Sequence, residues 1–183
     1  MTDSDLALLR KWQGGDAAAF EGLVRRWQGP VGRFVFHMTG RWQDVDDLSQ
    51  EVFLRVYLAG RRFCPRAAFS TWLYRIALNV VRDATRRKSL GKVMVNFPER
   101  SPERPDPHGG PEQACSRQEL ADTVTAAVAE LPEDLRTVVV LRHYQGMNFE
   151  EIGRVTGTPA STLKSRFAAA LAKLRKRVGS FET

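Results

Sequence analysis

The sequence has little of what metal proteins, disulfide-bonded proteins and membrane proteins require. Its 183 residues include two cysteines and three histidines, which lie far apart and form no ligand spacing. We therefore expect reduced cysteines, no metal site and no cofactor. No run of about 18 apolar residues is present, so no membrane span is predicted. The acidic start over residues 1–5 lacks the basic and apolar pattern of a secretory signal, which favours a cytoplasmic protein.

Catalytic constellations are absent from the sequence as well. No Ser/His/Asp set and no glycine-rich phosphate loop can be found, so we expect that the protein is not an enzyme. The formal net charge is +7 and the pI is near 9.9, which predicts an acidic partner, most commonly nucleic acid. Charge alone does not distinguish DNA, RNA and a basic protein that is merely soluble.

Apolar residues recur at helical spacing through most of the chain. Residues 6–12 predict a short first helix that ends at Gly14-Gly15. From Phe20 to Met38 the apolar stripe keeps one phase straight through Pro30. A proline inside a helix normally kinks or breaks it. Because the phase is not lost, we expect one long, bent helix here.

Residues 43–57 predict a helix with an acidic outer stripe. Its inner stripe consists of four apolar residues: Val45, Leu48, Val52 and Val56. Asp44, Asp47 and Glu51 follow one another at helical spacing on a different side. Acids in the first turn also stabilise a helix dipole, which accounts for the two aspartates well and for Glu51 poorly. The functional alternative is a docking face for a basic protein surface.

Residues 61–87 have the composition of a nucleic-acid surface. The loop 61–67 mixes arginines with Phe63, a combination of cations and stacking rings that suits a single strand. An arginine-rich surface loop is at least as common. The following helix has an apolar stripe that consists of Phe69, Trp72, Leu73, Ile76, Ala77 and Val80. Arg75, Asn79, Arg82 and Arg86 lie on another side, which is either a binding face or an ordinary solvated basic face.

Helical periodicity disappears from Ser89 to about Gln113. Five of the nine prolines lie between Pro98 and Pro111, together with Gly109-Gly110. We predict a flexible linker over residues 89–113. The chain is then all-α, with two small helical domains at residues 1–88 and 114–183 on either side of the linker.

The end of the chain predicts a helix-turn-helix. Asn148 caps a short helix with Glu151 in a capping-box position, and Thr156-Gly157 forms the turn. The longer second helix has a core face that consists of Leu163, Phe167, Ala170, Leu171, Leu174 and Val178. Between Pro159 and Val178 there are six basic residues and no acidic ones. A recognition helix that enters the major groove has this pattern, and a plain helical hairpin with a basic tail is the alternative.

Five segments together resemble the sigma-70 family of bacterial sigma factors, in its extracytoplasmic-function (group 4) subgroup. They occur in the family's order: residues 44–56, 69–79, 131–136, 146–152 and 162–166. The resemblance covers residues 5–88 and 115–178. It implies a region 2 helical bundle in the first domain and a region 4 helix-turn-helix in the second. It also implies binding to bacterial core RNA polymerase and to promoter DNA, and an anti-sigma factor as a further partner.

The resemblance assigns roles to individual residues. Residues that resemble the polymerase-binding segment are Asp44, Asp47, Gln50 and Glu51. Residues that resemble the reader of the minus-ten element are Arg61, Arg62, Phe63, Phe69, Arg75, Asn79, Arg82 and Arg86. Of these, Phe63, Phe69 and Asn79 are expected to receive a flipped base, and Trp72 is expected to be core. Residues that resemble the reader of the minus-thirty-five element are Ser161, Thr162, Lys164, Ser165 and Arg166.

A second functional hypothesis is a stand-alone helix-turn-helix regulator that binds duplex DNA without polymerase. Such a protein needs only its second domain for specific binding, and the acidic stripe of the first domain then has no role. A sigma factor, in contrast, needs core polymerase for specific binding and strand opening.

Overall fold

The computed structural model describes residues 3–61, 63, 68–90 and 123–178. The first half of the chain consists of α1 (Asp3–Gln13), α2 (Ala17–Thr39), the 3-10 turn η1 (Trp42–Asp44), α3 (Val45–Gly60) and α4 (Phe69–Leu90). The second half has a helical stretch over residues 123–129, then α6 (Glu133–Val139), the π-helix η2 (Val140–Tyr144), α7 (Phe149–Thr156) and α8 (Ala160–Val178). No strand occurs among these residues, so the predicted all-α class is confirmed.

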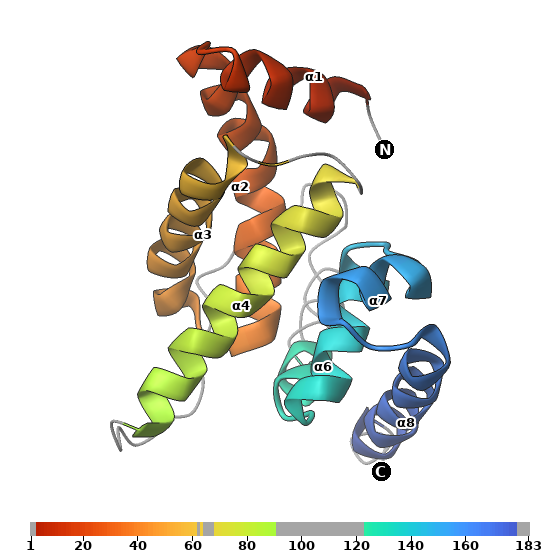
Figure 1. Cartoon of the computed structure of the whole chain (residues 1–183). Helices are drawn as coiled ribbons and strands as arrows, with labels where there is room; N and C mark the ends of the chain where they lie inside the picture. Colours follow the sequence, from red (N-terminus) through yellow and green to blue (C-terminus); the bar gives the residue numbers. More distant parts are fainter. Residues whose placement is uncertain (1–2, 62, 64–67, 91–122, 179–183) are drawn as a thin grey trace, which may run out of the picture.

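Helices α2, α3 and α4 pack against one another to form the first half, and α1 lies across the end of α2 (Figure 1). Arg26 of α2 fixes α1 because its guanidinium donates to the Ser4 hydroxyl at 2.7 Å and to the Asp5 carboxylate at 2.6 Å. The core between these helices contains Leu23, Phe34, Val52, Leu73 and Leu78. Each fully buried side chain of this kind contributes about 1.5–3 kcal/mol.

Helix α2 is one continuous helix, as its apolar phase predicts, even though Pro30 lies inside it. Proline removes one backbone donor and costs about 3 kcal/mol or more in a helix interior. Val31, Phe34 and Val35 follow it immediately and are fully buried, so packing after the proline offsets that cost. The helix ends at Gly40, whose left-handed φ of 69° lets its amide bond the Phe36 carbonyl.

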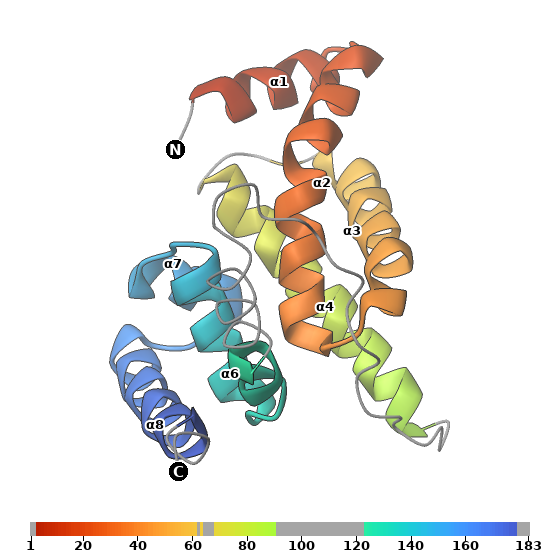
Figure 2. The ribbon, with the colours of Figure 1, turned by 180° about the vertical axis from the view of Figure 1, so that it is seen from behind.

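The second half packs directly against the first. Seen from behind, α6 and α7 lie beside the lower part of α2 and the middle of α4 (Figure 2). One continuous apolar core joins the two halves. The predicted linker 89–113 lies outside the described residues, except for its first two residues, which extend α4 to Leu90. No described helix is long and apolar enough to cross a membrane.

Helix α6 and η2 are helical throughout, although the run from Thr137 to Val140 is rich in β-branched residues. Thr137, Val138, Val139 and Val140 are all buried, which explains why tertiary packing overrides their preference for strands. Leu171 was expected in the core of the second half, but it is 38% exposed. Ala170, the preceding residue and another member of the predicted core face, is fully buried as expected.

Candidate functional site

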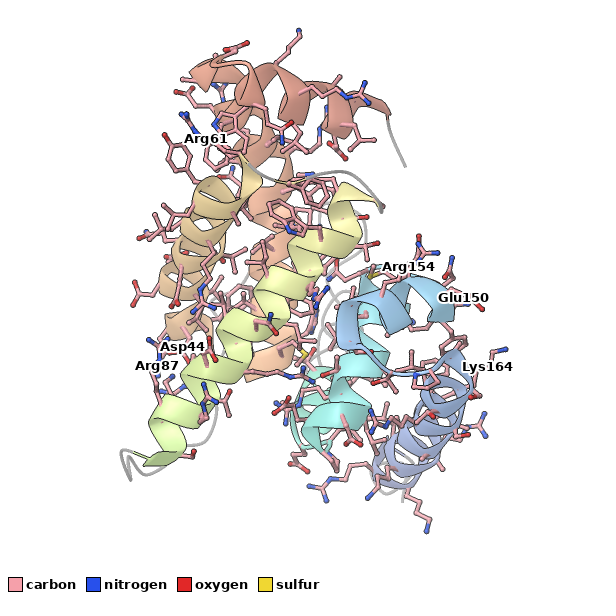
Figure 3. The ribbon with its side chains drawn as sticks, in the orientation of Figure 1. Asp44, Arg61, Arg87, Glu150, Arg154 and Lys164 are labelled. Carbon is pink, nitrogen blue, oxygen red and sulfur yellow. The ribbon has the colours of Figure 1, made fainter. Side chains whose placement is uncertain are left out.

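The predicted docking face lies on α3 and on the turn before it, and its four residues fall into two pairs. Asp44 and Glu51 are already engaged inside the molecule. Their ion pairs are Asp44–Arg41 at 3.4 Å, Asp44–Lys88 at 2.5 Å, Glu51–Arg55 at 2.5 Å and Glu51–Arg87 at 3.2 Å. Figure 3 shows Asp44 and Arg87 together at the lower end of α4. Asp47 and Gln50 are exposed and remain open to a partner.

Two leucines that sequence reasoning missed extend the open part of this face. Leu54 is 57% exposed and Leu58 is 69% exposed, and both continue the line of Asp47 and Gln50 at helical spacing. We name Asp47, Gln50, Leu54 and Leu58 the α3 stripe. The sequence contained a signal for these two leucines. Neither belongs to the inner stripe of Val45, Leu48, Val52 and Val56, so both had to lie on another side of the helix. Neighbouring exposed apolar side chains that are rimmed by polar residues mark sites of protein interaction.

Helix α4 presents the predicted basic face toward the second half. Arg75, Asn79 and Arg86 are exposed, and Arg82 is half-buried. A shallow hollow between α3, α4 and α6 is lined by Arg55, Asn79, Arg82, Asp83, Arg86 and Glu133. Within it, Arg82 Nε lies 2.8 Å from Glu133 Oε1 of α6. One acid of the second half therefore neutralises a cation of the predicted minus-ten face.

Phe63 in the loop before α4 and Trp72 in the first turn of α4 form an aromatic pair. The Phe63 ring stacks on Trp72 with centroids 4.3 Å apart and planes inclined by 29°, and both side chains are half-buried. Arg61 is exposed, and its guanidinium lies over the Tyr57 ring at 6.0 Å. The predicted contact residue Arg62 lies outside the described residues.

Phe69 does not fit the expected role of a base receiver. Its side chain is only 2% exposed and packs edge-on against Trp27, with ring centroids 5.9 Å apart. A nucleobase cannot reach a ring that is enclosed in the core. Phe69 belongs to the apolar stripe of α4, and it supports Trp72, which lies 5.8 Å away between ring centroids.

The second half contains the predicted helix-turn-helix, α7 followed by α8. Asn148 and Glu151 form a complete capping box at the start of α7. Gly157, with φ of 72°, ends α7 and makes the turn. Leu163 is fully buried and anchors α8 beneath its first turns. The helix-turn-helix predicted from these caps and turns is therefore confirmed.

The first turns of α8 present a polar face to solvent. The exposed members of the predicted set are Ser161, Thr162, Lys164 and Ser165. Figure 3 shows Lys164 pointing outward, on the same side of the molecule as Glu150 and Arg154 of α7. Arg166 differs, because its Nε lies 3.4 Å from the Asp134 carboxylate of α6 and its side chain is half-buried. It joins α8 to α6 in this structure.

Polar and aromatic contacts connect the two halves. The Arg136 guanidinium donates to the Met38 carbonyl at 2.6 Å, and the Tyr74 hydroxyl donates to the Gln145 side chain. His37 stacks on Tyr144 with ring centroids 3.7 Å apart. Burial, assisted by neighbouring cationic groups, lowers the pKa of His37 to about 4. Burial also raises the pKa of Tyr74. Both side chains are therefore neutral near pH 7, which suits a contact that is largely removed from water.

Comparisons with known proteins identify both halves. Residues 23–90 match the family model described as Sigma-70 region 2, and residues 121–174 match the model described as Sigma-70, region 4. The RNA polymerase sigma-H factor of Pseudomonas aeruginosa is 33% identical over 90% of this chain and 88% of its own length. The ECF RNA polymerase sigma-E factor of Escherichia coli is 32% identical over 96% of this chain and 94% of its own length.

Solved structures agree with this assignment. CnrH, which was solved in complex with the cytosolic domain of CnrY, aligns with a TM-score of 0.74 at 28% identity, over 97% of this chain and 99% of CnrH. The sigma factor RpoE of Bartonella quintana, solved with the anti-sigma factor NepR, shares the fold with a TM-score of 0.72 at 18% identity, over 87% of this chain and 96% of RpoE. The chain belongs to the extracytoplasmic-function subgroup of the sigma-70 family of bacterial RNA polymerase sigma factors.

Proposed function

We propose that this sigma factor binds core RNA polymerase through the α3 stripe and recognises promoters through two separate DNA faces. The observation that carries the proposal is that an exposed stripe with one acid and two leucines accompanies both basic faces in one chain. A regulator that acts alone on duplex DNA has no need for this stripe. The relatives, which match over nearly the whole chain, are named sigma factors, so the stand-alone alternative is not favoured.

In the polymerase interaction, Asp47 and Gln50 supply the polar contacts and the two leucines supply apolar area. Asp44 and Glu51 act indirectly, because their ion pairs with Lys88 and Arg87 hold α3 against the end of α4. A basic and apolar surface on the polymerase complements such a stripe.

At the minus-ten element, α4 and the loop before it hold the non-template strand. Arg75, Arg82 and Arg86 contact phosphates, while Asn79 offers both a donor and an acceptor to a base. Phe63 and Trp72 offer a stacking surface for a base that has left the duplex. Unstacking costs a few kcal/mol, and contacts with the single strand offset this cost.

At the minus-thirty-five element, α8 enters the major groove of duplex DNA. Ser161, Thr162, Lys164 and Ser165 face the base edges and the adjacent phosphates. Arg166 reaches the DNA after it exchanges the Asp134 carboxylate for a phosphate. In this scheme the protein contributes binding and specificity, while the polymerase carries out the chemistry. An anti-sigma factor is the expected regulatory partner, as NepR is for RpoE.

Charge reversal on the α3 stripe tests this assignment. Asp47→Arg is expected to weaken binding to bacterial core polymerase about 100-fold, because like charges across an interface cost several kcal/mol. Glu21→Arg is the matched control, since Glu21 is an exposed acid on α2 that pairs only with Arg25 among the described residues. Affinity is measured by fluorescence anisotropy with labelled sigma factor. Equal affinities of the Asp47→Arg variant and the wild type would remove α3 from the polymerase interface.

A further inference from the structure

Helix α1 contacts the loop that carries Phe63. This helix precedes the segment that matches region 2. Gln13 is its last residue. The Gln13 Nε2 group donates to the Gly60 carbonyl at 2.8 Å and to the Phe63 carbonyl at 2.9 Å. Both protons of one side-chain amide are therefore used, one at the end of α3 and one in the loop. The bonded residues are 47 and 50 positions away in the sequence, so this contact is tertiary.

The neighbouring Trp12 fixes the place from which Gln13 acts. Trp12 is buried, and its ring lies against the backbone of Gly60, where a Cβ atom would stand 2.4 Å from the ring. Phe20 and Tyr57 surround the same ring, with centroids 4.9 Å and 5.6 Å away. Only glycine permits this approach at position 60. The end of α1 is thus held rigidly against the end of α3.

Phe63 is the residue that this anchor restrains. Its amide donates to the Gly60 carbonyl at 3.1 Å, and its carbonyl accepts from Gln13. With both backbone groups held, the Phe63 ring is placed on Trp72 by contacts within the fold itself. A surface that is already ordered loses less conformational entropy when a base binds, which raises affinity without adding a contact.

We infer that Gln13 is a positioning residue for minus-ten recognition, acting through the Phe63 carbonyl to hold the Phe63–Trp72 stack in place. The inference rests on the proposed function of that stack. Gln13 itself touches no nucleic acid in this role. Through Gln13, helix α1 thus takes part in promoter opening, in addition to packing on α2.

The test uses the full chain with core polymerase and a forked promoter fragment. The fragment has a duplex minus-thirty-five element and a single-stranded non-template minus-ten segment, taken from sequences that the wild-type protein selects. A scan with abasic sites through the minus-ten segment finds the base whose loss weakens binding most. The ratio of affinities for the intact fragment and for that abasic fragment reports base recognition separately from all other contacts.

Gln13→Met removes both donors at similar side-chain length, and Gln13→Glu places an acceptor against two carbonyls. Both variants are expected to bind the intact fragment about tenfold more weakly and to reduce the ratio to about two, with Gln13→Glu the more affected. Affinity for core polymerase is expected to stay within about twofold of the wild type. Gln13→Lys keeps a donor and is expected to retain most of the ratio. Gln28→Met and Gln28→Glu, on the exposed side of α2, are the matched controls.

Two results overturn the inference. A wild-type ratio in Gln13→Met would show that Gln13 does not position the stack. A second contrary result would be that polymerase affinity and the helical circular dichroism signal fall in the same proportion as promoter affinity. This result would show that Gln13 has a general structural role. If the wild type itself distinguishes no abasic fragment, the proposed minus-ten function fails, and the inference fails with it. That outcome is distinct because it appears before any substitution is made.

Discussion

The two predicted DNA helices, α4 and α8, differ in how far their basic side chains are already satisfied. Along α4, Arg82 pairs with Glu133, Arg86 with Asp83, Arg87 with Glu51, and Lys88 with Asp44. In the first turns of α8, Arg166 pairs with Asp134 of the same half, whereas Lys164 is exposed and makes no ion pair with any described residue. Both helices carry a net positive charge, but their surroundings differ.

The basic face of α4 is partly covered by ion pairs, whereas Lys164 of α8 is open to solvent. Glu133 belongs to the second half, so the Arg82–Glu133 pair joins the two halves and must break before Arg82 can contact a phosphate. Lys164, in the first turns of α8, points away from α4 and needs no such exchange (Figure 3). In the proposed function, Lys164 can therefore contact duplex DNA directly, whereas Arg82 must first release Glu133 before it contacts the single strand.

The largest effect is expected from charge reversal on the open face. Lys164→Glu is expected to weaken holoenzyme binding to a duplex minus-thirty-five fragment about 30-fold, because a phosphate contact becomes a repulsion. Lys173→Glu makes the same charge change farther along α8 and is expected to cost only a few-fold. The measurement is a titration of the labelled duplex fragment with holoenzyme at a fixed salt concentration. Equal losses in both variants would mean that the first turns of α8 have no special contact.

The next effect is a pH dependence at the contact between the halves. Burial, Arg33 and His143 lower the pKa of His37 to about 4, below its ordinary value of 6.5. Between these values the unfolded chain binds a proton that the folded chain does not. The contribution of His37 to the free energy of unfolding is therefore fully present above pH 6.5. It falls as the pH falls toward 4, by about 2 kcal/mol after solvent screening.

His37→Phe isolates this effect, because phenylalanine keeps a ring against Tyr144 and cannot titrate. Urea unfolding of both proteins across the same pH range gives the difference and removes the contribution of carboxylates. The wild type is expected to lose more stability than the variant on acidification. Parallel pH profiles would show that His37 does not sense pH at this contact.

The smallest effect is expected from opening the covered face of α4. Glu133→Lys replaces an ion pair with a repulsion, and exposed pairs contribute about 0.2–1 kcal/mol. The free chain is expected to bind a single-stranded oligonucleotide up to about fivefold more tightly. Asp134→Lys is the matched control, because this neighbouring acid pairs with Arg166 of α8 instead. The same gain in both variants would mean that net charge, and not uncovering, is responsible.

Much of the fold follows from periodicity and caps. The continuous phase through Pro30 predicted α2, and the capping box at Asn148 predicted the start of α7. These signals are local and come from a few neighbouring residues. Leu171 was misplaced because it lies near the edge of the apolar face of α8, where spacing does not determine which residue is covered.

Long-range partners decided the parts that the sequence could not predict. Asp44 and Glu51 have the spacing of a docking stripe, but each also pairs with a residue of α4 that lies more than 30 positions away. Phe69 has an aromatic ring that could stack on a base, but Trp27 of α2 packs against this ring in the core. Gln13 carries no local signal at all, because its role depends on the position of the Phe63 carbonyl.

The most direct test of the central claim is selection of a randomised promoter library by gel shift, with and without bacterial core polymerase, followed by a probe of strand opening. We predict weak, sequence-independent binding of duplex DNA by the chain alone. With core polymerase we predict specific retardation, open minus-ten segments and two selected sequence elements. Specific binding by the chain alone that core polymerase does not change would contradict the account.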